Sequence, residues 1–245
     1  MDVDYDRIAK HYDAHRRAGD LYIDTLLALL GACSGRRVLE LGAGTGNSTA
    51  AITGRTGCTM TALEISPGML RQAAAKRIPA RWVRASAAQL PFKGGAFDYV
   101  FSTYMLHYIG DLAGLMRECA RVLEKGCAAF VTAPASFIRD HPMNEYFPSL
   151  AGVDLARFQR IEAVEAALRD GGFVRVGHEQ RARAPEPVNE AYVEKVASKF
   201  VSTYDLLPPG EFEAGLARLR SDVRERRRPG LTVTWETVTI WGWRE

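Results

Sequence analysis

Residues 37–48 read Arg37-Val38-Leu39-Glu40-Leu41-Gly42-Ala43-Gly44-Thr45-Gly46-Asn47-Ser48, an apolar run typical of a buried strand that ends in three alternate glycines and leads directly into a helix-like segment. Glycine permits positive φ and lets a ligand approach main-chain N–H groups with no Cβ between them. In open α/β folds this kind of loop lies at the carboxyl edge of a parallel sheet, where ligands bind. The stretch therefore predicts a nucleotide-type binding loop, and the alternative is a purely structural turn.

Short apolar runs alternate with helix-like segments along most of the chain, and such alternation predicts an α/β fold with a parallel sheet. A charge-rich helical stretch at 189–228, which follows a Pro-bearing linker at 184–187, is expected to form a cap over the sheet edge. The last apolar run alternates in the way an antiparallel strand does. The predicted strands are 38–41, 59–63, 82–85, 97–101, 128–132, 173–176 and 232–243, and the predicted helices are 21–30, 46–52, 67–76, 111–123 and 157–169.

The composition is that of an ordinary globular protein: 245 residues, 47% hydrophobic and 25% charged, with a formal net charge of +3. This balance excludes disorder, collagen and coiled coil, and the charge is too small to imply a polyanionic partner. The four cysteines (33, 58, 119 and 127) form no CxxC pair and have no His at metal-ligand spacing, so we expect free thiols and no metal site. The N-terminal residues lack an apolar signal-like run, which predicts a cytoplasmic, unanchored protein.

A second carboxylate, Glu64, follows the next strand-like run after the glycine loop. In a βαβ unit this position presents an acceptor to ribose hydroxyls, so Glu64 indicates an adenosine ligand with an unphosphorylated ribose. The alternative is a solvent-exposed residue at the start of a helix, where carboxylates are also favoured.

The spacing of the glycines separates the adenosine ligands from one another. A dinucleotide fingerprint would require glycine at the position of Asn47, whereas here the third glycine is Gly46. With Glu40 two residues before Gly42, the pattern is E-x-G-x-G-x-G. It resembles motif I of the class I S-adenosylmethionine-dependent methyltransferases.

The resemblance continues in three further blocks. Gln89-Leu90-Pro91-Phe92 with residues 95–100 resembles the "LPF…FDxV" block of the ubiquinone/menaquinone-methyltransferase-like branch (methyltransferase type 11), and residues 115–126 resemble its helix leading to "RVLKPGG". Weaker similarity covers 5–13 and 171–173. The resemblance implies a Rossmann-like, seven-stranded, mostly parallel sheet with flanking helices and a helical cap before the last strand. It further implies one domain over 1–245, made of a helical lid (1–33), a cofactor-binding core (34–182), the cap (183–230) and a final antiparallel strand (231–245).

Carried over residue by residue, the resemblance implies a set of cofactor-binding side chains. Glu64 would bind the ribose, Ile65 would pack on adenine and Glu40 would orient the amino-acid moiety. One departure is Ala85-Ser86-Ala87, where the branch usually has an Asp that accepts from the adenine amino group; a serine hydroxyl can also accept, so we expect weakening by about 1 kcal/mol at most. The complete set is Tyr12, Glu40, Gly42, Ala43, Gly44, Gly46, Glu64, Ile65, Met69, Ser86, Ala87 and Thr103.

The implied reaction, in-line transfer of a methyl group, needs alignment of the acceptor and, for a protonated acceptor, a base. His107 follows the fourth predicted strand and titrates in the useful range, so it is the first candidate base, with Tyr104 as a second catalytic candidate. The alternative for His107 is that it only orders the loop. His141 and Tyr146 are secondary candidates, and the basic run 224–228 is read as a solvated helix face.

These observations predict a methyltransferase that uses S-adenosylmethionine, releases S-adenosylhomocysteine and acts on a small-molecule acceptor. Nucleic acid is not an expected partner, since no N-P-P-Y or D-P-P-Y run follows the fourth strand, and a membrane is not expected because no long apolar run occurs. The chain would be a monomer or homodimer. The alternatives are other S-adenosylmethionine chemistry or an inactive cofactor-binding module, while Asn47 disfavours a nicotinamide oxidoreductase. No motif identifies the acceptor atom.

Overall fold

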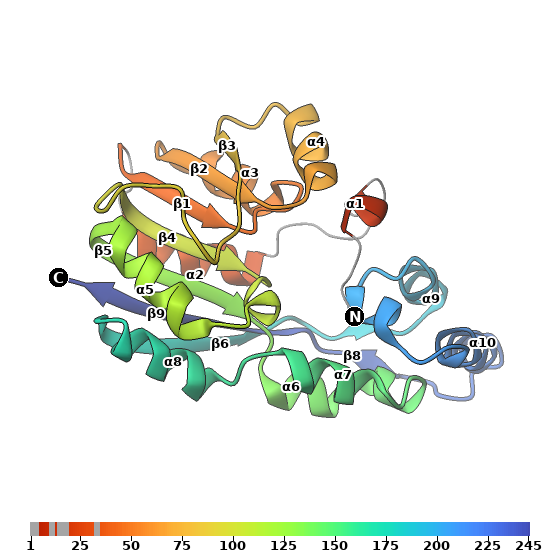
Figure 1. Ribbon diagram of the computed structural model, residues 1–245. Helices are drawn as coiled ribbons and strands as arrows, with labels where there is room; N and C mark the ends of the chain where they lie inside the picture. The colour runs from red at the N-terminus through yellow and green to blue at the C-terminus, as the bar shows by residue number, and fades with distance from the viewer. Residues whose placement is uncertain (1–4, 10–12, 14–19, 32–34) are drawn as a thin grey trace.

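The computed structural model describes residues 5–9, 13, 20–31 and 35–245 (Figure 1). A seven-stranded sheet has the order β3-β2-β1-β4-β5-β9-β6, in which β9 alone runs antiparallel to its neighbours. The strands are β1 Arg37–Leu41, β2 Thr59–Glu64, β3 Arg81–Arg84, β4 Phe97–Thr103, β5 Leu123–Thr132, β6 Val174–Ala182 and β9 Glu236–Arg244. This arrangement confirms the predicted seven-stranded, mostly parallel sheet.

Helices cover both faces of the sheet because side chains alternate along each buried strand. In β1, Leu39 and Leu41 pack toward α5 and α8, whereas Val38 packs on the other face against α2 and α3. The four covering helices are α2 Asp20–Leu30, α3 Asn47–Thr53, α5 Leu112–Val122 and α8 Ile161–Asp170. The helix α4 Pro67–Ala75 contacts β2 and β3 near one edge, and Ser66 caps it by accepting from the Met69 N–H.

A helical cap lies beyond the carboxyl ends of the parallel strands, and Figure 1 shows their arrowheads pointing toward it. Its apolar interior is separate from the two sheet faces and includes Tyr192, Val196, Tyr204 and Phe212. The cap comprises α9 Glu190–Ala197, η4 Ser202–Leu206 and α10 Glu211–Arg224, and it packs against α6 Ala135–Asp140, η3 Pro142–Glu145 and α7 Leu150–Arg157. The short helix α1 Tyr5–Ile8 packs on α4.

Two predicted elements are wrong. Residues 232–243 do not form one strand: β8 Thr232–Val233 pairs with β7 Glu186–Pro187 in a separate ribbon, and β9 starts only at Glu236. The predicted linker at 184–187 therefore contains a strand. The break falls at Trp235, whose ring packs against Phe137 and Phe200 and whose indole N–H donates to Glu186. These tertiary contacts outweigh the alternating pattern.

The predicted helix at 157–169 is also wrong at its start. Arg157 ends α7, and α8 begins only at Ile161. Phe158 and Arg160 between them have extended backbone, with ψ of 130° and 145°. The Phe158 ring stacks on His107, so a contact far away in the chain interrupts a helical pattern that looked continuous.

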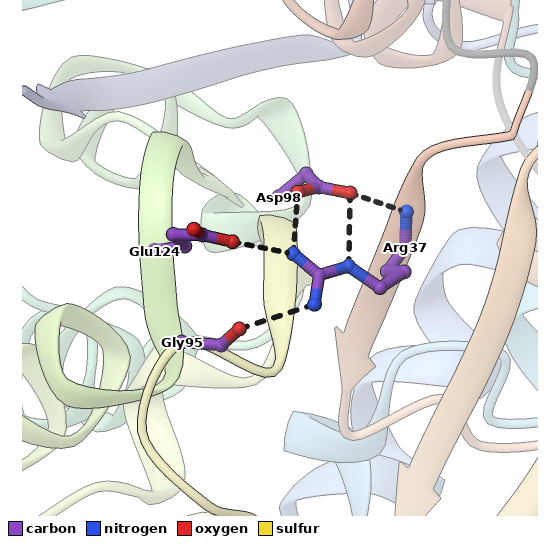
Figure 2. A network of polar contacts seen from close by, with 4 residues as sticks. All are labelled: Arg37, Gly95, Asp98 and Glu124. Carbon is purple, nitrogen blue, oxygen red and sulfur yellow. Dashed lines mark hydrogen bonds and ion pairs between the residues drawn. The ribbon is translucent and has the colours of Figure 1, made fainter.

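Asp98 lies at the amino end of β4, and Figure 2 shows its polar network with Arg37, Gly95 and Glu124. Its carboxylate accepts from the Arg37 backbone N–H at 2.7 Å and pairs with the Arg37 guanidinium at 2.7 Å. The same guanidinium donates to the Gly95 carbonyl and to Glu124. The hydrogen bonds from Arg37 lower the pKa of Asp98. Asp98 and Arg37 thus join β1, β4 and β5, and Asp98 takes no part in the site below.

Candidate cofactor and acceptor site

The glycine loop connects β1 to α3, and its three glycines have φ of +67°, +56° and +82°. A Cβ on Gly42 would lie 2.6 Å from Met105 Cγ, and one on Gly46 would lie 2.7 Å from both Ile78 and Trp82. A Cβ on Gly44 would meet nothing within 4 Å. Gly42 and Gly46 are therefore required by packing inside the protein, whereas Gly44 faces open space that a ligand can fill.

That open space belongs to a cavity of about 620 Å³ between the glycine loop and the cap. Of the predicted site residues, Gly42, Ala43, Gly44, Thr103, Tyr104 and His107 line it. Sequence reasoning missed most of the far wall, which includes Phe137, Asp154, Lys195 and Trp235. These residues come from α6, α7, α9 and the chain before β9, so no local spacing could have grouped them.

Glu64 is 7% exposed and holds the loops together, which excludes the alternative of a solvent-exposed helix-start residue. One oxygen accepts from the Gly44 N–H at 2.8 Å, and the other accepts from the N–H groups of Ile65 and Ser66, each at 2.8 Å. A carboxylate has about four acceptor sites, so one position remains for a further donor such as a ribose hydroxyl. Ribose binding by Glu64 stays a prediction.

Glu40 is buried beneath the glycine loop, at 1% exposure, and does not line the cavity. Its Oε2 accepts from Thr49 Oγ1 at 2.5 Å, while Oε1 is buried without a hydrogen-bond partner in the described structure. Burial raises the pKa of Glu40 to about 8, and the nearby Glu64 adds to the rise. The structure therefore places a protonated acid, rather than an exposed carboxylate, at the first position of E-x-G-x-G-x-G near neutral pH.

The predicted adenosine-side residues lie outside this cavity. Ile65 is 63% exposed, so its apolar side chain is open to stacking by an adenine ring. Met69, in contrast, is 1% exposed, so its side chain belongs to the interior. Ser86 is exposed, and its hydroxyl accepts from the Ala88 N–H at 3.2 Å. Ala87 lies between these two residues, in the turn that follows β3. Gly46 is covered by Ile78 and Trp82.

We expect Ser86→Asp to tighten S-adenosylmethionine binding by about 1 kcal/mol, roughly fivefold in Kd. An aspartate keeps the acceptor for the Ala88 N–H and adds a second oxygen for an adenine amino group. Calorimetry on the purified variant measures the change, with Ser86→Ala as the control that should bind more weakly than the parent. Unchanged or weaker binding by Ser86→Asp would count against adenine recognition at this turn.

His107 and Tyr104 stand on the acceptor side of the cavity. His107 lies in η2 Leu106–Tyr108, and its ring stacks on Phe158 with centroids 4.4 Å apart and an interplanar angle of 13°. Tyr104 has φ of +52°, a strained conformation for a residue with a Cβ, and its ring meets Tyr22 edge-on at 6.2 Å. Thr103 Oγ1 lies 3.3 Å from Ser48 Oγ. These contacts hold the three side chains at the rim of the glycine loop.

The secondary candidates have structural partners instead. His141 Nδ1 accepts from the Met143 N–H, and burial lowers the pKa of His141 to about 4. Tyr146 donates to Asp222 at 3.1 Å. In the basic run 224–228, Arg227 pairs with Asp222 and Arg228 with Glu145, both at exposed positions. None of these side chains lines the large cavity.

Two N-terminal carboxylates that were not predicted fasten the chain start to the site. Asp6 accepts from Ser66 Oγ and from the Gly68 N–H, both at 2.6 Å. Asp13 accepts from Thr45 Oγ1 at 2.5 Å and pairs with Lys76 at 2.6 Å. The predicted Tyr12 lies outside the described residues, whereas Asp13 itself lies beside the glycine loop.

The described residues contain no group of three or more His, Cys, Asp or Glu side chains arranged to hold a metal ion. In the same part of the chain, no helix is both long and apolar enough for a membrane crossing.

Comparison with known proteins gives a consistent picture. Residues 39–131 match a family model described as a methyltransferase domain. The chain is 33% identical over 129 residues to a demethylmenaquinone methyltransferase of Tropheryma whipplei, covering 50% of this chain and 54% of that protein. It is 33% identical over 132 residues to a malonyl-[acyl-carrier protein] O-methyltransferase of Pseudescherichia vulneris, covering 54% and 52%. The chain thus spans about half the length of these relatives.

Solved structures extend the likeness to nearly the whole fold. A putative methyltransferase from an antibiotic biosynthesis pathway of Anabaena variabilis superposes with a TM-score of 0.77 at 21% identity, over 90% of this chain and 96% of that one. A phosphoethanolamine N-methyltransferase of Haemonchus contortus, solved with S-adenosylhomocysteine, has a TM-score of 0.62 at 15% identity, over 98% and 57%.

Proposed function

We propose that the chain, whose residues 39–131 match a methyltransferase domain model, is a class I S-adenosylmethionine-dependent methyltransferase of the menaquinone-methyltransferase-like branch and transfers the methyl group of S-adenosylmethionine to a small-molecule acceptor. The observation that carries this proposal is Gly44: it has positive φ, no neighbour within 4 Å of its Cβ position, and a place on the wall of a cavity that continues into the cap. The names of the curated relatives give demethylmenaquinone and a malonyl group on acyl-carrier protein as methyl acceptors.

The residues present fit the cofactor. The open position at Gly44 lets a ligand reach the backbone, Glu64 keeps an acceptor position for a ribose hydroxyl, and Ile65 exposes an apolar surface for adenine. When bound, S-adenosylmethionine supplies an electrophilic methyl group on a sulfonium. Gly42, Ala43 and Gly44 would hold its methionyl and ribose parts.

The rest of the chemistry falls to positioning by the chain's own side chains. In-line displacement is accelerated mainly by holding the acceptor close and aligned, and by excluding water. The far wall of the cavity and η2 enclose it from the side opposite to the glycine loop. His107, which lines this space, would accept the proton that a hydroxyl or amine acceptor loses.

We expect His107→Gln to lower kcat about a hundredfold while the Kd for S-adenosylmethionine stays within about twofold. The reason is that glutamine cannot accept a proton near neutral pH. His107→Phe is the matched control for the ring stack on Phe158, because it preserves the ring and removes both nitrogens. If the phenylalanine variant retained the parental turnover, His107 would be a loop-ordering residue and not a base.

Calorimetry with S-adenosylmethionine, S-adenosylhomocysteine and NAD tests the proposed function directly. We expect micromolar binding of the first two and none of NAD, since Asn47 replaces the third glycine of the dinucleotide fingerprint. Binding of NAD alone would overturn the proposal in favour of an oxidoreductase. Binding of the two sulfur ligands without turnover over a broad acceptor panel would favour a cofactor-binding module, the reading that Ser86 supports.

We also propose the domain division that the sequence predicts: a lid over 1–33, a core over 34–182, a cap over 183–230 and a final strand over 231–245. Its support is the separate apolar interior of the cap. A cytoplasmic location, a monomer or homodimer, and the absence of a nucleic-acid partner stay predictions.

A further inference from the structure

The far wall of the cavity carries two residues with cationic side chains, Arg183 and Lys195, and both residues contact Trp235. The Arg183 backbone N–H donates to the Trp235 carbonyl at 2.8 Å, and the Lys195 ammonium lies 5.5 Å from the centroid of the Trp235 ring. Neither residue belongs to a recognisable motif. The chemistry of these two residues determines which class of acceptor this wall can bind.

Lys195 is held in place by its surroundings. Its Nζ donates to both oxygens of Glu186, at 2.9 and 3.1 Å, and lies 4.8 Å from the ring centroid of Phe200 and 5.5 Å from that of Tyr192. The electron-rich faces of these rings are what a cationic ligand would need. Because the lysine ammonium already occupies them, this wall disfavours a cationic acceptor.

Arg183 differs from its neighbours in having no resident counter-ion. Within the described structure, no hydrogen bond or ion pair joins its guanidinium to another side chain, whereas Arg181, two residues earlier, pairs with Glu179 at 3.0 Å. The side chain is exposed and lines the cavity. A guanidinium presents a planar pair of donors that matches a carboxylate. Arg183 is therefore available to an anion in the cavity.

The acidic group on the cavity wall does not cancel this positive charge. Asp154 is the one carboxylate among the described residues that line the cavity. One of its oxygens accepts from Thr203 Oγ1 at 2.7 Å, and the Arg157 guanidinium lies 3.8 Å away. The negative charge of Asp154 is therefore compensated by Arg157, which does not line the cavity. The positive charge of Arg183 has no such partner among the described side chains.

We propose that the methyl acceptor is an acid: a flat, apolar molecule with an anionic group that Arg183 binds, its body lying against Phe137, Phe200 and Trp235. This inference rests on the proposed function and names the substrate class of that site. Aromatic walls bind an apolar body, and the guanidinium of Arg183 selects its charge.

The test uses three phenols with one ring and different charges at the para position: 4-hydroxybenzoate, 4-hydroxybenzamide and 4-hydroxybenzylamine. Calorimetry measures their binding to the full chain saturated with S-adenosylhomocysteine at low salt. We expect the acid to bind at least about tenfold more tightly than the amide, and the amine more weakly than both. Higher ionic strength should reduce the advantage of the acid. An acid that binds no better than the amide, including no detectable binding of either at millimolar concentration, overturns the proposal.

Variants test whether Arg183 causes the preference for the acid. Arg183→Gln should abolish the advantage of the acid, and Arg183→Lys should retain part of it, because the charge remains while the planar fork is lost. Arg117→Gln, an exposed arginine on α5 away from the cavity, is the matched control and should behave as the parent. An unchanged preference in Arg183→Gln overturns the assignment of this residue. Lys195→Gln is measured with its melting temperature, since loss of the Glu186 pair also affects the cap.

The two levels of proposal fail in different ways. If S-adenosylhomocysteine itself does not bind, the proposed function is wrong. If it binds and the acid shows no advantage over its amide, the methyltransferase reading stands and only the acidic acceptor is rejected.

Discussion

Gly44→Asn will abolish measurable binding of S-adenosylmethionine, with a rise in Kd of about a thousandfold or more, equivalent to about 4 kcal/mol. The protein itself leaves room for the new side chain, since nothing lies within 4 Å of the Cβ position. The asparagine would instead fill the space through which a ligand approaches the loop backbone. Asparagine tolerates the left-handed φ of +56° better than other residues, so the fold should lose only about 1 kcal/mol.

Gly31→Asn is the matched control for this prediction. Gly31 has φ of +60°, also has nothing within 4 Å of its Cβ position, and lies outside the cavity. It should show the same small loss of unfolding free energy with unchanged cofactor binding. If Gly44→Asn bound the cofactor with parental affinity, the ligand would not approach the backbone here, and the glycine loop would be a structural turn.

Glu40→Gln will remove a large pH dependence of stability. The folded-state pKa of about 8 lies above the ordinary value of 4.5, so the folded protein holds a proton between these pH values that the unfolded chain has lost. The stabilisation from the protonated acid is complete below pH 4.5 and is lost as the pH rises toward 8. The limiting slope is about 1.4 kcal/mol per pH unit, which makes the total several kcal/mol. Glutamine has no proton to lose.

Urea unfolding of the parent and the variant at pH 5, 6.5 and 8 measures this effect as a difference between two curves. The unfolding free energy of Glu40→Gln, measured relative to that of the parent, should increase as the pH rises. His141, with its pKa lowered to about 4, has the opposite slope between about pH 4 and 6.5, but it is present in both proteins and cancels in the difference. Glu162→Gln, on the exposed face of α8, should track the parent. Parallel curves for the parent and Glu40→Gln would mean that Glu40 is ionised in the folded protein.

Local sequence was sufficient where a residue's role depends on its chain neighbours. The alternate glycines after an apolar run predicted the loop at β1, and the predicted helix at 67–76 agrees with α4, whose first turn Ser66 caps. Capping and strand burial act within a few residues, so their patterns remain visible in the chain.

Local sequence was insufficient wherever distant segments compete. The alternating pattern of residues 232–243 indicated one strand, but pairing of β8 with β7 and the packing of Trp235 divide it. Helical spacing indicated a helix from Arg157, yet the stack of Phe158 on His107 keeps the chain extended there. Neither partner is close in sequence, so no window around these residues contains the competing interaction.

The sheet, the glycine loop and the carboxylates Glu40 and Glu64 could be identified from the chain alone, because each depends on periodicity and short spacing. The state of those carboxylates could not. Burial leaves Glu40 protonated near neutral pH, and three backbone N–H groups occupy most of Glu64. The far wall of the cavity likewise exists only after folding, when Arg183, Lys195 and Trp235 come together across the cavity from the glycine loop. Desolvation and long-range packing are properties of the assembled interior, and a linear sequence does not display them.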